Sequence, residues 1–192
     1  ASVQAARAAN ATPDAAEVTY DAAKATTITL SGSTATASGS GVAVSGSTVR
    51  IMAGGTYVLS GTLNGQVVVD SATSDEVKLV LSGATITSST GAAIAFVDAG
   101  ESVVVLADGT TNSLTDAAAY AATTCADAAN AALFSMADLT IGGAGTLDVT
   151  GQFDDGITSK DGLVISGGTI TVKAVDDGVR GKDHLAVTGG TI

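Results

Sequence analysis

The sequence predicts an all-β fold, specifically a right-handed parallel β-helix (β-solenoid) with about 22 residues per coil in its C-terminal part. Three observations support this prediction: an internal repeat, short segments of alternating apolar and polar residues, and a composition that suits many short strands. Of the 192 residues, 45% are hydrophobic and 24 are glycine, whereas Trp is absent and only three Phe and three Tyr occur. Stacked layers of Val, Ile, Leu and Ala fit that composition.

The repeat is clearest at the C-terminal end. FDDGITSKDGLVISGGTI, residues 153–170, aligns without a gap with VDDGVRGKDHLAVTGGTI, residues 175–192, at an offset of 22 residues. The Asp-Asp-Gly, Lys-Asp and Gly-Gly turn residues coincide, and a weaker third copy around ALFSMADLTIGGAGTLDV precedes them. Units repeated at a fixed period are expected to stack at the interstrand spacing of about 4.8 Å. The repeat therefore predicts two pairs in adjacent layers, Ile157 with Val179 and Leu163 with Leu185.

A β-sandwich is the alternative architecture, because it also consists of many short strands and turns. It would not need an identity between turn residues 22 positions apart, so the solenoid is preferred. We expect residues 1–26 to form a flexible leader and residues 27–192 the β-helix, with an Ala-rich inserted loop at about 115–130. The chain stops at Ile192, whereas the previous copy continues beyond Ile170, so we expect the C-terminal end to be truncated.

The net charge of −11 argues against nucleic acid as a partner and against anionic membrane surfaces, because both repel an acidic protein. The eight Lys and Arg residues are scattered, and no apolar run approaches the roughly 18 residues of a membrane span. Cys125 is the only cysteine, so an intramolecular disulfide and a Cys-based zinc cluster are excluded, and we expect it to be a small apolar filler. We expect a monomer without membrane insertion.

Paired aspartates in two successive copies are the candidate metal ligands: Asp154 and Asp155 in one copy, and Asp176 and Asp177 in the next. If the copies stack at about 4.8 Å, an effective dielectric constant near 20 gives a repulsion of about 3.5 kcal/mol between equivalent carboxylates. Such a ladder favours a cation, and Ca²⁺ takes six to eight oxygen ligands in a flexible geometry. The same side chains could instead cap turns by accepting backbone N–H bonds, so both roles stay open.

Three cations are candidate ligand-binding residues. Lys160 and Lys182 form a second ladder, and Arg180 follows the second Asp-Asp-Gly. All three could contact sugar carboxylates, Arg180 in a bidentate manner. Local ion pairing with the aspartate after each lysine explains that ladder as well, and exposed pairs are worth only about 0 to 1 kcal/mol. Phe153 aligns with Val175, which favours a packing role over a sugar platform.

The most specific segments, GSGVAVSGSTVRIMAGGTYVLSGTL, ADGTTNSLTD, NAALFSMADLTIGGAGTLDVTG and the DDGI/DDGV copies, resemble a known family. It comprises bacterial carbohydrate-binding proteins with a calcium-containing right-handed β-helix, similar in fold to pectate lyases. The resemblance implies a secreted or cell-surface protein that binds plant cell-wall polysaccharide, acidic pectic chains (polygalacturonate) and cellulose, with Ca²⁺. One departure is Met136-Ala137-Asp138, where the family commonly has a charged pair, which puts a charged contact there in doubt.

Three functional classes follow: a carbohydrate-binding module, a calcium-dependent pectate lyase, and a structural adhesin solenoid. A lyase needs a base beside the uronate carboxylate, and Lys160, Lys182 and Arg180 are the available candidates. They do not converge on one acid-base site in the sequence, so we assign no catalytic residue and prefer binding to enzymatic activity. The absence of Trp argues against strong stacking on neutral glucans.

Overall fold

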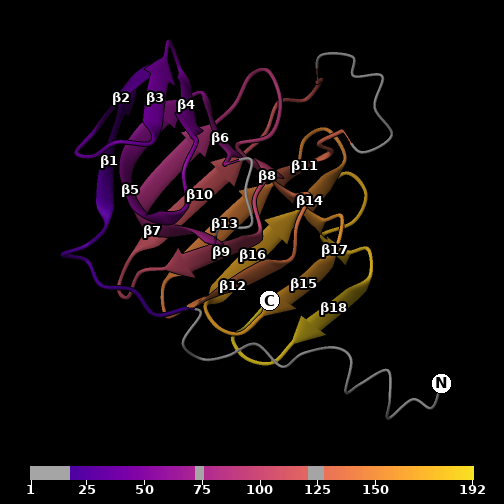
Figure 1. Ribbon diagram of the computed structural model, residues 1–192. Coiled ribbons are helices and arrows are strands. Elements are labelled where there is room, and N and C mark those ends of the chain that lie inside the picture. The colour runs from indigo at the N-terminus through magenta and orange to yellow at the C-terminus, as the bar shows by residue number, and fades with distance from the viewer. Residues whose placement is uncertain (1–17, 72–75, 121–127) are drawn as a thin grey trace.

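The computed structural model describes residues 18–71, 76–120 and 128–192. The predicted all-β class is confirmed, because every regular element within these ranges is a strand. The strands form two sheets that face each other across a shared apolar core (Figure 1). The described ranges contain no helix long and apolar enough to span a bilayer.

The larger sheet has 11 strands, of which eight follow the order β16-β13-β10-β7-β9-β12-β15-β18 and three, β5, β1 and β2, extend it beyond β7. Its strands are β1 (Thr26–Gly32), β2 (Thr34–Ala37), β5 (Gly55–Asn64), β7 (Glu76–Thr87), β9 (Glu101–Leu106), β10 (Thr111–Thr115), β12 (Leu139–Gly143), β13 (Thr146–Thr150), β15 (Gly162–Ile165), β16 (Thr169–Lys173) and β18 (His184–Val187).

The smaller sheet has seven strands in the order β17-β14-β11-β8-β6-β4-β3. Its strands are β3 (Val42–Ser45), β4 (Thr48–Ile51), β6 (Gln66–Asp70), β8 (Ile94–Asp98), β11 (Ala131–Ser135), β14 (Asp155–Ser159) and β17 (Val179–Gly181).

The predicted right-handed parallel β-helix is wrong as a description of this layout. The described strands form two mixed sheets, arranged as in a sandwich, and no closed three-sided coil is found among them. Two features account for the difference. The pairs β1–β2 and β3–β4 are antiparallel. The long strand β7 also pairs with β9 through its first half and with β10 through its second half, so two rows of strands join in one sheet.

Glycines explain how β5 and β7 continue through a bend instead of ending at a corner. Gly61 in β5 has a φ of 96° and Gly83 in β7 a φ of 78°, values in the left-handed region that favours glycine. The register between the two strands shifts between Leu59 and Gly61. A bulge of this kind re-aims a strand without ending its pairing.

The predicted pairing of successive copies is confirmed. Ile157 pairs with Val179 in the parallel pair β14–β17, and Leu163 pairs with Leu185 in the parallel pair β15–β18. The row through Ile157 continues across the smaller sheet and is fully buried as far as β4. Its buried members are Val49, Val67, Ile94, Leu133 and Ile157.

Glycines also fix the turn between β15 and β16 and the equivalent turn after β18. A Cβ on Gly167 would lie 2.6 Å from the carbonyl oxygen of Gly143, and a Cβ on Gly189 would lie 2.4 Å from that of Ser166. Real side chains do not approach a backbone oxygen so closely, so only glycine allows these backbones to pack. The Gly-Gly identity of the repeat therefore reports a steric requirement.

Several predicted boundaries fall partly outside the described residues. Residues 1–17 of the expected leader and residues 121–127 of the expected insertion, with Cys125, lie outside them. The first described strand begins at Thr26, close to the predicted start of the folded part. The division into leader, folded part and truncated C-terminal end stays a prediction.

Candidate functional site

Side chains that carry carboxylate or amide oxygens gather at one end of the smaller sheet, where three neighbouring strands begin. Strands β11, β14 and β17 are parallel neighbours, so the residues at their starts lie side by side. Asn130 directly precedes β11, Asp154 precedes β14, whose first residue is Asp155, and Asp176 lies in the turn before β17. We call Asn130, Asp154, Asp155 and Asp176 the acidic edge.

Three carboxylates of the acidic edge converge. One oxygen from each of Asp154, Asp155 and Asp176 lies within 4.8 Å of the others. Asp155 is fully buried, Asp154 is half-buried, and Asp176 is exposed, so the cluster runs from the interior to the surface. At this separation unscreened carboxylates repel one another, and a cation would relieve the repulsion.

Asp155 is held by three hydrogen bonds. Its Oδ2 accepts from Asn130 Nδ2 at 2.9 Å and from Thr158 Oγ1 at 2.8 Å, and its Oδ1 accepts from the backbone N–H of Asp177 at 3.1 Å. A buried carboxylate needs such donors to offset its lost hydration. The Asp155 side chain therefore both caps the turn and belongs to the carboxylate cluster.

Asn130 is a further polar residue at the acidic edge that the sequence interpretation missed. Its Nδ2 donates to Asp154 Oδ2 at 3.0 Å as well as to Asp155, while its buried Oδ1 has no hydrogen-bond donor among the described residues. An orphaned buried amide oxygen is costly unless a partner binds it. Asn130 was detectable in principle, because the pairing of Leu133 with Ile157 places it opposite Asp154.

Asp177 does not join the cluster, although it was predicted as a ligand. Its carboxylate oxygen lies 3.8 Å from Arg180 Nη1, and the same nitrogen lies 3.9 Å from Asp155 Oδ2. The Arg180 side chain is 51% exposed, so its guanidinium stands beside the acidic edge and remains open to a ligand. Of the three predicted cations, Arg180 is the one at this edge.

Lys160 and Lys182 lie at the other end of the strands. Lys160 directly follows β14, and a rise of about 3.3 Å per residue separates the two ends of that strand by about 13 Å. The Lys160 Nζ lies 5.8 Å from the centre of the Phe134 ring, and Lys182 is exposed. Neither lysine forms an ion pair with a carboxylate among the described residues, so the expected local Lys-Asp pairs are not found.

A second acidic ladder accompanies these lysines. Burial, together with the neighbouring carboxylates Asp138 and Asp183, raises the pKa of Asp161 above its ordinary value. Asp138 also accepts a hydrogen bond from the backbone N–H of Gly162 at 2.8 Å. The three side chains therefore share a region of like charge away from the acidic edge.

An aromatic pair borders the acidic edge. The rings of Tyr120 and Phe153 stack with centroids 4.4 Å apart and planes at 18°. The Tyr120 hydroxyl lies 2.7 Å from Asp116 Oδ2 and 2.9 Å from the Ala131 carbonyl oxygen. Burial and the Asp116 carboxylate raise the Tyr120 pKa, so the phenol stays neutral. Phe153 is 40% exposed, so the expected packing role is only part of its environment.

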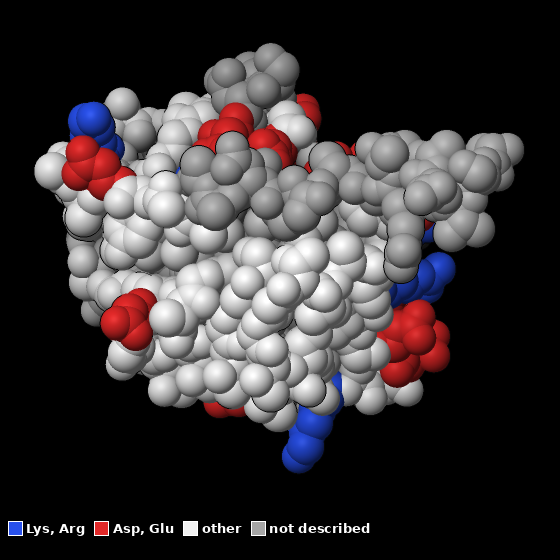
Figure 2. All heavy atoms as spheres, turned by 90° about the horizontal axis from the view of Figure 1, so that it is seen from below, with Lys and Arg blue, Asp and Glu red and all other residues white. Residues whose placement is uncertain are grey.

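The charges elsewhere on the surface are sparse. On the face shown in Figure 2, charged side chains lie in separate groups towards the margin and leave a broad uncharged middle. The described residues of that face form no continuous basic area of the kind that would attract a nucleic acid backbone.

The family model of carbohydrate-binding domain-containing proteins matches residues 45–192, and the chain belongs to that family. A curated relative of that description from Acetivibrio thermocellus is 43% identical over 122 residues, which make up 62% of this chain and 43% of the relative. The chain thus matches less than half of that relative's length. All residues of the acidic edge lie within the family match.

A solved structure supports the same relationship. It is described as a polysaccharide lyase-like protein from C. thermocellum in a gadolinium derivative, and it superposes with a TM-score of 0.79 at 32% sequence identity. The similarity covers 86% of this chain and 80% of that chain.

Proposed function

We propose that this chain is a secreted or cell-surface binding module that holds Ca²⁺ at the acidic edge and binds acidic pectic polysaccharide through it. The observation that carries the proposal is the convergence of Asp154, Asp155 and Asp176 within 4.8 Å, next to the orphaned oxygen of Asn130. Membership of a carbohydrate-binding family gives this cluster a ligand class.

The donor set suits calcium. Ca²⁺ takes six to eight oxygen ligands and accepts carboxylates and amide carbonyls, whereas structural zinc sites favour His and Cys. Three carboxylates and one amide oxygen leave room for backbone carbonyls, water and a ligand oxygen. The exposure of Asp176 opens that remaining side to solvent, where a sugar carboxylate could complete the coordination.

A bridging cation also resolves an electrostatic conflict. The chain carries a net charge of −11, and polygalacturonate is itself a polyanion, so the two repel without a counterion. Calcium shared between the acidic edge and sugar carboxylates removes that repulsion. Arg180 beside the edge adds a direct carboxylate contact, while Lys160 and Lys182 contribute attraction from the far end of the strands. Cellulose carries no carboxylate, so we expect weaker binding to it.

The test is a titration of polygalacturonate with the protein in calcium and in chelator. We expect binding in calcium and a loss of at least about tenfold in affinity in chelator. Arg180→Ala should weaken the calcium-dependent binding, whereas Lys173→Ala, which removes an exposed cation from the larger sheet, should not. Binding that ignores the chelator would refute the bridging mechanism.

The same samples test lyase activity. A lyase would generate an unsaturated sugar with ultraviolet absorbance, and the signal should rise steadily with time. A rise abolished by Lys160→Ala or Lys182→Ala would reassign the chain from binding module to enzyme. A flat trace with retained binding supports the proposal.

A further inference from the structure

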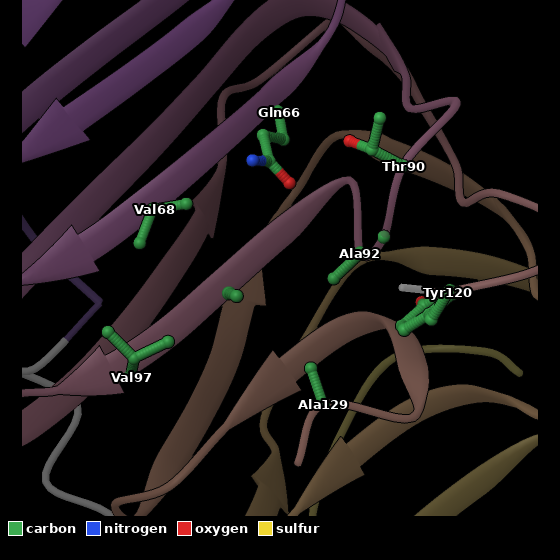
Figure 3. Close-up of a pocket in the computed structure, with 9 residues that line it drawn as sticks. Gln66, Val68, Thr90, Ala92, Val97, Tyr120 and Ala129 are labelled. Carbon is green, nitrogen blue, oxygen red and sulfur yellow. The ribbon is translucent and has the colours of Figure 1, made fainter. Parts of the chain in front are cut away.

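A shallow apolar groove lies on the outward face of the smaller sheet. It has a volume of about 210 Å³. Figure 3 shows its labelled side chains facing a common space, with Val68 and Gln66 on one side and Ala92, Tyr120 and Ala129 on the other. The lining residues come from β6, β8 and the segments that flank β8 and β11, and they include Val97 and Thr90.

The groove is unusual for an outward sheet face because its floor is apolar and open. Val97 is 42% exposed and Val68 is half-buried, while Ala95, which pairs with Val68, is buried. None of the described residues that line the groove is charged, and the polar groups among them are the amide of Gln66 and the hydroxyl of Thr90 near the rim, with Tyr120 on the wall. An apolar floor with a few polar groups is the usual character of a small-molecule site.

Tyr120 connects this groove to the acidic edge. Its ring forms part of the groove wall and also stacks on Phe153, which directly precedes Asp154. The Tyr120 hydroxyl is held by the Asp116 carboxylate and the Ala131 carbonyl oxygen, so the ring has a fixed orientation. The aromatic pair therefore links the apolar groove to the acidic edge.

We propose that the groove is a second sugar subsite, which binds the apolar face of a pyranose ring of the same glycan chain that the acidic edge holds through calcium. A pyranose presents C–H groups on its faces and hydroxyls around its rim. The C–H face fits the floor of Val68 and Val97, and the hydroxyls can exchange hydrogen bonds with Gln66 and Thr90. The volume suits one ring rather than a folded oligosaccharide. This inference rests on the proposed function, because it assigns a second contact to the same ligand.

The test compares two valine substitutions. Val97→Asp places a charge in the groove, and Val44→Asp places one at a valine that is 36% exposed on β3 and does not line the groove. In saturating calcium, Val97→Asp should lower the affinity for an oligogalacturonide at least about tenfold, and Val44→Asp should leave it within about twofold. Calcium should stabilise both variants as it stabilises the wild-type protein, because neither residue belongs to the acidic edge.

Two further measurements separate the possible failures. Val97→Thr keeps the size of the side chain and should retain most of the affinity. If Val97→Asp loses affinity while Val97→Thr keeps it, the groove contacts the sugar. If wild-type protein binds the oligogalacturonide and Val97→Asp binds equally well, the subsite is refuted while the calcium proposal stands. If wild-type protein binds no acidic glycan in calcium, the proposed function itself fails. A Val97→Asp variant that loses its calcium-dependent stabilisation would show a disturbed fold and also contradict the inference.

Discussion

Asp176→Asn should stabilise the protein in chelator and destabilise it in calcium. In chelator, the substitution removes one of three carboxylates that lie within 4.8 Å of one another. Coulomb's law with an effective dielectric constant near 20 gives about 3.5 kcal/mol for one such pair. Because Asp176 is exposed, water and salt reduce this figure to roughly 1 kcal/mol. The metal-free variant should therefore be more stable than the metal-free wild-type protein.

Calcium should invert that order. At 100 times its dissociation constant, a ligand that binds only the folded state adds about 2.7 kcal/mol, which is roughly 5 to 11 °C in Tm for a chain of this length. If loss of one ligand raises the dissociation constant tenfold, the same calcium concentration adds only about 1.4 kcal/mol to the variant. Calcium thus raises the Tm of the variant about half as much as that of the wild-type protein.

The assay is calorimetric melting of both proteins in calcium and in chelator. Asp177→Asn is the matched control, since this neighbouring aspartate does not join the cluster and its carboxylate lies beside Arg180. We expect the control to keep the full response to calcium. Equal responses in all three proteins, or a metal-free Asp176→Asn variant less stable than the wild-type protein, would refute the reasoning.

Other substitutions test separate parts of the structure. Asp161→Asn should stabilise the protein at neutral pH, because the raised pKa of Asp161 means that its charged form is disfavoured in the folded state. The gain in stability should shrink as the pH falls through that pKa. Thermal melts in chelator that show the same gain at every pH would contradict this prediction. Asn130→Ala should weaken calcium binding about tenfold by calorimetric titration, whereas the exposed Asn64→Ala should not. Ile157→Ala should cost about 2 to 5 kcal/mol in denaturant unfolding, and Val179→Ala less because that side chain is only half-buried.

The parallel registers could be predicted from the sequence, but the layout of the sheets could not. Identity between turn residues fixes which residues pair, as the partners Ile157 and Val179 show. It does not reveal where a strand continues through a bend, because Gly61 and Gly83 look like ordinary turn glycines in the sequence. The antiparallel pairs near the N-terminal end likewise lie where the repeat has already faded.

The candidate site was predictable to a similar degree. Asp154, Asp155 and Asp176 could be found because the repeat aligns them, whereas Asp177 shares that alignment but its carboxylate lies apart from the cluster. Asn130 was missed because its copy is offset by 24 residues and keeps only the apolar skeleton. Phe153 stacks on Tyr120, and this contact joins two segments that the repeat does not relate.

The glycine packing at Gly167 and Gly189 has a consequence for how such a chain can be lengthened. Each glycine seats its turn directly on the backbone of the preceding copy, so steric contact fixes the position of the turn against that copy. A one-residue insertion between Asp155 and Gly167 would shift either the acidic side chain or the glycine out of its row. Whole 22-residue units, by contrast, can be added without disturbing either row. We therefore expect the cation-binding capacity of an engineered array to rise in steps with unit duplication, and to be lost through single-residue insertions.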